Sequence, residues 1–93
     1  MDMQKSRLGV YADIPAALSH KKLIVGAKQL RKALRAGTVR CVYLAENADP
    51  AITQPLAEAC EQSQIPCHWI SSMRELGHAC GIDVGTAAAA IVA

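Results

Sequence analysis

Short apolar runs alternate with segments of helical period from residue 23 onward, and this alternation constrains the fold more than any other feature. The apolar runs cover residues 23–25, 39–45, 67–70 and 86–92. Each run is short, and the run of residues 39–45 includes β-branched residues, which is typical of buried strands. Strands that alternate with helices predict a sheet with helices packed on both faces. We therefore expect an α/β fold, a three-layer α/β/α sandwich around a mixed sheet of about four strands.

Two of the expected helices have clear signals at their ends. From residue 27 apolar side chains recur at helical spacing, and Gly37 is placed to end that helix in a left-handed conformation. Ser72 and Glu75 match a capping box, in which the two side chains satisfy free amides at a helix start. This second helix is expected to run to about Cys80 and to stop at Gly81.

A further helix is expected in the middle of the chain, but two prolines complicate its start. The dipeptide Asp49-Pro50 is a helix-start signal. Pro55 would then lie inside the helix, where its ring clashes with the carbonyl group of Ala51. We therefore expect a tight turn at residues 50–53 and a helix from about residue 54 to residue 63.

The 93 residues are expected to form a single domain. Residues 1–19 are a weakly patterned N-terminal extension, in which Asp13-Ile14-Pro15 is typical of a helix start and residues 15–20 of a short helix. The N-terminus lacks the apolar segment of a signal peptide, and no apolar run is long enough to span a bilayer. We therefore expect a cytoplasmic protein that does not contact membranes.

Patterns that would indicate catalysis or metal binding are not found in the sequence. It has no nucleophile elbow, no P-loop and no glycine spacing typical of dinucleotide binding. The cysteines form no C-x-x-C pair, so buried, reduced thiols are favoured over a metal site, although histidines lie near two of them. The four cysteines are Cys41, Cys60, Cys67 and Cys80. We expect a protein that is not an enzyme and that binds neither a cofactor nor a metal.

Charge is distributed very unevenly along the chain. Residues 1–40 carry nine Lys and Arg side chains against two acidic ones, a net charge of +7. Residues 41–93 carry one Arg side chain against six acidic ones, a net charge of −5. Such polarity favours one surface that meets a polyanion, although a solvated basic helix with no partner would give the same pattern.

The strongest candidate for that surface is the turn at Gly26, where a strand leads into a helix. Free amides at a helix start, together with the helix dipole, can hold a phosphate group. Gln29 can donate to or accept from a base edge. Basic side chains follow along the helix, namely Lys28, Arg31, Lys32 and Arg35. Composition alone favours an ordinary solvated helix over a helix that binds nucleic acid.

A second candidate is the segment of residues 81–85, where two apolar side chains lie between glycines. Ile82 and Val84 are placed to pack against an extruded base. Alternatively, Gly81 ends the preceding helix in a Schellman motif, in which Ile82 folds back on its own helix. The sequence leaves both readings of Ile82 open and slightly favours exposure of Val84.

Four stretches in the right order resemble the ribosomal L7Ae and L30e family of kink-turn RNA-binding proteins, and its small bacterial members most closely. They are residues 26–37 (GAKQLRKALRAG), 42–50 (VYLAENADP), 65–66 (IP) and 76–85 (LGHACGIDVG), within a span of residues 20–93. The resemblance implies a three-layer α/β/α fold. It also implies that the partner is structured RNA containing a kink-turn, in the ribosome or another ribonucleoprotein, and we expect a monomer when the protein is free.

The resemblance also implies roles for particular residues. Lys28, Gln29 and Lys32 would contact tandem sheared G·A pairs through a major groove that the kink opens. The segment Ile82-Asp83-Val84 would cover the extruded loop nucleotide, with Glu46 in a neighbouring loop. The full expected RNA-binding set is Gly26, Ala27, Lys28, Gln29, Arg31, Lys32, Glu46, Ile82, Asp83 and Val84.

Two other functions fit the same sequence. The first is a protein-interaction subunit that uses this fold without binding RNA, which would show no salt-dependent association with RNA. The second is the RNA-recognition subunit of an RNA-modifying enzyme, since related folds occur beside methyltransferases. That function requires a catalytic partner, which a pull-down would reveal.

Overall fold

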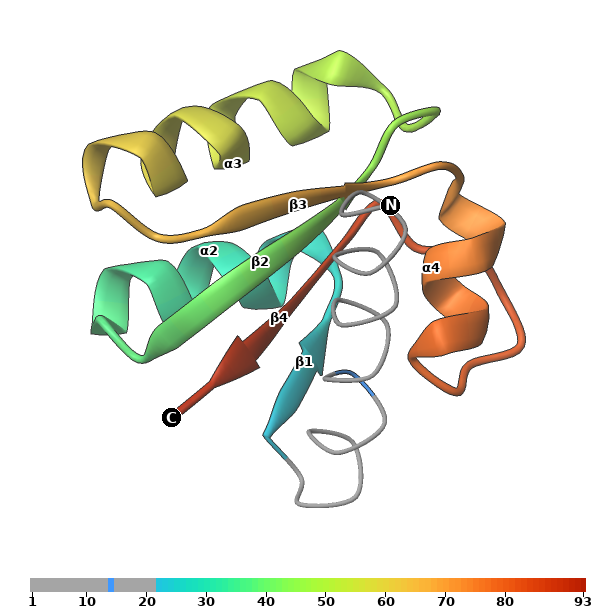
Figure 1. Cartoon of the computed structure of the whole chain (residues 1–93), viewed down its shortest axis with the longest axis horizontal. Coiled ribbons are helices and arrows are strands. Elements are labelled where there is room, and N and C mark those ends of the chain that lie inside the picture. Colours follow the sequence, from blue (N-terminus) through green and yellow to red (C-terminus); the bar gives the residue numbers. More distant parts are fainter. Residues whose placement is uncertain (1–13, 15–21) are drawn as a thin grey trace, which may run out of the picture.

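The computed structural model describes Ile14 and residues 22–93, in which four strands alternate with three helices (Figure 1). The elements are β1 (Leu23–Val25), α2 (Ala27–Ala36), β2 (Val39–Ala45), α3 (Pro50–Gln62), β3 (Cys67–Ile70), α4 (Met73–Ala79) and β4 (Ala88–Val92). The strand order in the sheet is β1-β4-β2-β3. Strands β2 and β3 are parallel, whereas β4 is antiparallel to both β1 and β2. The expected mixed, four-stranded sheet is therefore confirmed.

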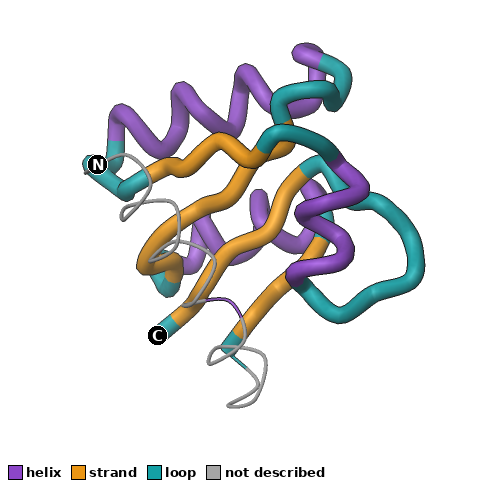
Figure 2. Tube along the Cα trace, turned by 45° about the vertical axis from the view of Figure 1, so that its right-hand side comes forward, coloured by secondary structure: helices purple, strands orange, loops and turns teal. Residues whose placement is uncertain are grey.

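Helices cover both faces of the sheet, which confirms the three-layer arrangement. On one face Leu30 of α2 and Leu56 of α3 pack in one apolar cluster with Val42 and Leu44 of β2. On the other face Leu76 of α4 packs with Tyr43 in a second cluster. Figure 2 shows the four strands running between these helices. Because aromatic side chains are few, both clusters are built mainly from aliphatic residues.

Strand β4 lies in the middle of the sheet and is covered on both faces. Its residues Ala88, Ala89 and Ala90 have no exposed surface. Ala88 and Ala90 belong to the cluster under α2 and α3, whereas Ala89 belongs to the cluster under α4. Small side chains at these positions let helices approach the sheet closely from both sides.

The expected start of the middle helix is wrong. Helix α3 begins at Pro50 and includes Pro55, so residues 50–53 are helical and do not form a separate turn. Asp49 caps the first turn, since its Oδ1 accepts from the amide of Ala51 at 2.9 Å. Pro55 is exposed, as is Ala51, whose carbonyl group loses its helical donor and can bind water instead. The buried face of the helix outweighs the missing hydrogen bond.

The other element ends agree closely with expectation. Gly37 ends α2 in the left-handed region with φ of 73°, and the Ser72 Oγ accepts from the Glu75 amide at 3.1 Å at the start of α4. Strand β4 begins two residues later than expected, because the hydroxyl of Thr86 donates to the carbonyl oxygen of Ala88 at 3.0 Å and forms a local turn. The helix expected over residues 15–20, with its start at residues 13–15, lies outside the described residues apart from Ile14, which is helical and buried.

Candidate nucleic-acid interface

One end of the sheet brings together the start of α2, the loop after β2 and the loop before β4. The Gly26 amide donates to the carbonyl oxygen of Ala88 at 2.8 Å, which joins the start of α2 to β4. The Ala45 amide donates to the carbonyl oxygen of Ala87 at 2.9 Å, and the Glu46 amide donates to that of Ile70 at 2.8 Å. Segments far apart in the sequence therefore reach the same end of the molecule.

The start of α2 has the geometry of an anion-binding helix end. Gly26 has φ of +105°, a conformation that glycine adopts readily, and the space beside its Cα is open. The Leu30 amide donates to the Gly26 carbonyl oxygen at 3.0 Å and so makes the first helical hydrogen bond. The amides before Leu30 have no acceptor within the helix and can serve a ligand. Ala27 is half-buried, while the side chains of Lys28 and Gln29 are exposed.

The cations of α2 form a single exposed stripe. Leu30 is fully buried on the opposite side of the helix. Because successive residues are rotated by about 100°, the four cations fall within an arc of roughly 100°. We call this set the basic stripe: Lys28, Arg31, Lys32 and Arg35. Gln29 lies on its flank, and α2 contains no acidic residue.

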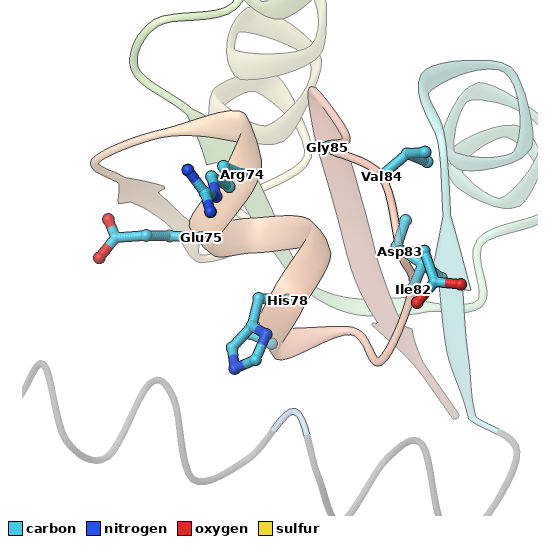
Figure 3. A pocket seen from close by; sticks show the side chains of 8 residues that line it. Arg74, Glu75, His78, Ile82, Asp83, Val84 and Gly85 are labelled. Carbon is cyan, nitrogen blue, oxygen red and sulfur yellow. The ribbon is translucent and has the colours of Figure 1, made fainter.

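The loop between α4 and β4, residues 81–87, is called the final loop. It begins with a Schellman motif, in which the Gly81 amide donates to the carbonyl oxygen of His78 at 3.0 Å and the Ile82 amide donates to that of Gly77 at 3.0 Å. The Schellman motif, one of the two alternatives for Ile82, is therefore present in its backbone, and the side chain of Ile82 is half-buried. Val84 is 70 % exposed, and Figure 3 shows it pointing away from α4. Asp83 is also exposed.

Two glycines that were not among the expected site residues hold the final loop against α4. A Cβ on Gly77 would lie 2.1 Å from the carbonyl oxygen of Val84, so only glycine permits this approach. A Cβ on Gly85 would lie 3.1 Å from the Cβ of Met73. The Thr86 amide also donates to the Met73 carbonyl oxygen at 3.1 Å. Gly77 and Gly85 occur in the motif of residues 76–85, but their packing role follows only from the structure.

Asn47 lies in the loop expected beside the final loop but is not among the expected site residues. Its Oδ1 accepts from the Met73 amide at 2.7 Å and thereby joins the loop after β2 to the start of α4. The two residues are 26 positions apart, so no local pattern indicates this contact. The neighbouring Glu46 is exposed and lines a groove beside α3 and β3, whereas Ile82 and Val84 line a different hollow against α4. Glu46 thus lies at the same end of the sheet as the final loop but opens onto another surface.

Burial raises the pKa of the thiols of Cys60, Cys67 and Cys80 and holds them in their protonated form. Burial raises the pKa of Cys67 to about 12, with the neighbouring Cys60 thiol adding to the effect. Burial raises the pKa of Cys80 to about 11. Thiolate is the form that attacks electrophiles or binds metals, so these side chains act as buried apolar groups near neutral pH. Within Ile14 and residues 22–93, no three His, Cys, Asp or Glu side chains are grouped for metal binding.

Known proteins match this chain over nearly its whole length. The family model described as the ribosomal protein L7Ae/L30e/S12e/Gadd45 family matches residues 9–93. The chain belongs to this family. The match begins upstream of the stretches that carry the resemblance in the sequence, so it includes part of the N-terminal extension.

Among the helices that the structure describes, none has the length and hydrophobicity needed to cross a bilayer.

Individual relatives agree with this family assignment. The chain is 46% identical over 71 residues to an "RNA-binding protein" of Caldanaerobacter subterraneus subsp. tengcongensis, covering 76% of this chain and 87% of the relative. It is 44% identical to an "RNA-binding protein" of a Geobacillus strain over the same shares of the two chains. Its fold is similar to the structure of a 15.5 kD RNA-binding protein of Giardia lamblia, with a TM-score of 0.86 and 31% identity over 94% of this chain and 73% of that one.

Proposed function

We propose that this chain is a non-catalytic RNA-binding protein that recognises kink-turn RNA. One observation carries the proposal: the start of α2, with its basic stripe, and the final loop reach the same end of the sheet. Membership of the L7Ae family and relatives named as RNA-binding proteins support it. A kink-turn offers an opened groove and an extruded nucleotide close together, and two neighbouring protein surfaces match those features.

The start of α2 is assigned to the opened groove. An ordinary RNA major groove is too deep and narrow for side chains to read, so only a kinked or opened groove admits a helix start. Lys28 and Lys32 supply charge for phosphates, and the amides after Gly26 add donors at the helix end. Gln29 has both a donor and an acceptor for the edges of sheared G·A pairs. Arg31 extends the charge along the RNA backbone.

The final loop is assigned to the extruded nucleotide. Val84 is exposed and offers an apolar surface, and the half-buried Ile82 lines the same hollow against α4. Because Gly77 and Gly85 fix this loop against α4, the apolar surface is formed before RNA binds. A loop that is already ordered loses little conformational entropy on binding.

We further propose a cytoplasmic location and a ribosome or another ribonucleoprotein as the setting.

The first test compares a kink-turn RNA with a straight duplex of matched composition. Lys28→Ala and Gln29→Ala should each weaken kink-turn binding at least tenfold in an electrophoretic shift or a fluorescence titration. Lys28→Ala should also reduce the slope of log affinity against log salt by about 1, because one phosphate contact is lost. The matched control is Lys22→Ala, which removes the same exposed charge next to the opposite end of β1. Unchanged affinity in the two α2 variants would contradict the assignment.

A second test addresses the final loop. Val84→Ser removes exposed apolar surface without disturbing the core, since the side chain is 70 % exposed. We expect it to weaken kink-turn binding several-fold and to leave straight-duplex binding unchanged, because only the kink-turn presents an extruded nucleotide. Equal losses for the two RNAs would argue against packing on a base. Absence of any salt-dependent RNA association would instead favour a protein-interaction subunit.

A further inference from the structure

A groove lies between α3 and the edge strand β3, and Glu46 is the one member of the expected RNA-binding set that lines it. It has a volume of about 560 Å³. We call it the acidic groove, and the residues of interest on its walls are Glu46, Gln54, Glu58, Glu61 and Trp69. Trp69 is 48 % exposed, an unusual state for the only tryptophan of the chain.

The acidic groove and α2 lie on opposite flanks of α3. Arg31 and Arg35 of α2 meet the flank of α3 formed by Pro55 and Ala59. Glu58 and Glu61 line the acidic groove together with Trp69. With about 100° between successive residues, Glu61 and Ala59 point in nearly opposite directions from the helix axis. A ligand in the acidic groove and an RNA on α2 would therefore not compete for the same side chains.

The charge around the acidic groove is uniformly negative. Residues 41–73 contain four acidic side chains and no Lys or Arg. Three of the four, Glu46, Glu58 and Glu61, line the groove. Such a potential repels the phosphates of RNA and attracts cations. The groove therefore suits a positively charged partner and not a second stretch of nucleic acid.

We propose that the acidic groove docks an extended, arginine-containing segment of a protein partner. An arginine guanidinium can stack on the exposed face of Trp69 and pair with the carboxylate of Glu58 or Glu61. Lysine has no planar group for this stacking and cannot pair bidentately, so arginine is the better match. An extended segment suits the position, because β3 is an edge strand whose outer side pairs with no other strand among those described. This inference does not rest on kink-turn recognition.

Trp69 provides a direct readout of occupancy. As the only tryptophan, it dominates the intrinsic fluorescence of the protein and lies in the groove itself. We expect an arginine-rich peptide, added without RNA, to change the Trp69 emission in a saturable way. The same peptide with lysine in place of arginine should bind at least threefold more weakly. Equal binding of the two peptides, or no change in emission at saturation, would overturn the proposal.

Substitutions test whether the groove or only the net charge attracts the peptide. Glu58→Gln and Glu61→Gln combined should weaken binding of a fluorescein-labelled peptide about fivefold, because two exposed charge pairs with the peptide are lost. Trp69→Leu should weaken it by a similar factor, measured by anisotropy. The control, Glu75→Gln, removes an exposed charge from α4 and should leave the affinity within twofold. These side chains are exposed, and circular dichroism verifies that each variant is folded.

Two outcomes would refute the assignment of the groove. If Glu75→Gln weakens peptide binding as much as either groove variant alone, the peptide responds to overall charge only. If the protein self-associates in sedimentation experiments and Trp69→Leu abolishes that association, a second copy of the chain occupies the groove and not a basic segment. Neither result bears on RNA binding, which the α2 variants test separately.

Discussion

The substitution Gly77→Ala tests how the final loop is held. A Cβ at this position would lie 2.1 Å from the Val84 carbonyl oxygen, whereas ordinary contact begins at 3.4 Å. The loop and α4 would have to separate by more than about 1 Å, the difference between these distances. Movement is restrained because the Thr86 amide is bonded to Met73 and Gly85 packs on the same residue.

The expected free energy combines two opposing effects. Alanine is favoured over glycine inside a helix by about 1 kcal/mol. Overpacking against a restrained backbone costs about 1–3 kcal/mol, and the short distance places this contact at the upper end of that range. We therefore expect Gly77→Ala to lower the free energy of unfolding by about 1–2 kcal/mol and the Tm by about 4–16 °C. Thermal unfolding followed by circular dichroism measures this change.

The control and the RNA readout make the prediction specific. His78→Ala alters the next residue on an exposed part of α4 and should change the free energy of unfolding by less than about 0.5 kcal/mol. Gly77→Ala should also weaken kink-turn binding more than straight-duplex binding, because the loop moves and the start of α2 does not. A Tm equal to or above that of the parent protein would refute the reasoning, since it would show that the loop yields without cost.

Two further predictions follow from contacts outside the RNA-facing side chains. Asn47→Ala removes the 2.7 Å hydrogen bond to the Met73 amide and should lower the free energy of unfolding by about 1 kcal/mol. The control, Asn47→Asp, keeps an acceptor and should retain most of the stability. Equal losses for the two variants in chemical denaturation would show that the hydrogen bond does not matter. The raised pKa of Cys67 predicts that stability is fully present below the unfolded pKa of 9.0 and falls as pH rises toward 12, because the unfolded chain releases its proton first. Cys67→Ser should flatten this part of the stability profile, and an unchanged profile would contradict the role of burial.

Local signals in the sequence predict the elements that depend on local chemistry. The short apolar runs become β1, β2 and β3, Gly37 ends α2, and the Ser72–Glu75 signal starts α4. Each of these outcomes depends on residues within one or two turns of the chain. The predicted start of α3 is wrong because Pro55 has a local cost that is visible in the sequence, whereas the burial that offsets this cost is visible only in the structure. Thr53, Leu56 and Cys60 bury one face of that helix, and this tertiary packing offsets one missing hydrogen bond.

The candidate site was only partly predictable, because its support is non-local. The basic stripe follows from the sequence, since four cations recur on one face of a single helix. The link from Asn47 to Met73 and the contact of Gly77 with Val84 require the tertiary fold, which brings those segments together. The family resemblance directed attention to Ile82 and Val84 but not to the glycines that position them. Residues that touch a ligand are thus easier to select from sequence than residues that hold them in place.

The position of α3 gives the unequal charge of the sequence a structural meaning. One flank of this helix lines a hollow with Arg31 and Arg35, and Glu61 lies on its other flank, in the acidic groove. If the two charge groups shared one surface, they would neutralise each other and weaken attraction for any charged partner. Because the two hollows share no lining residue, the cations and the carboxylates face different surfaces. The fold can therefore present a cationic surface to RNA and an anionic groove to a basic segment in the same complex.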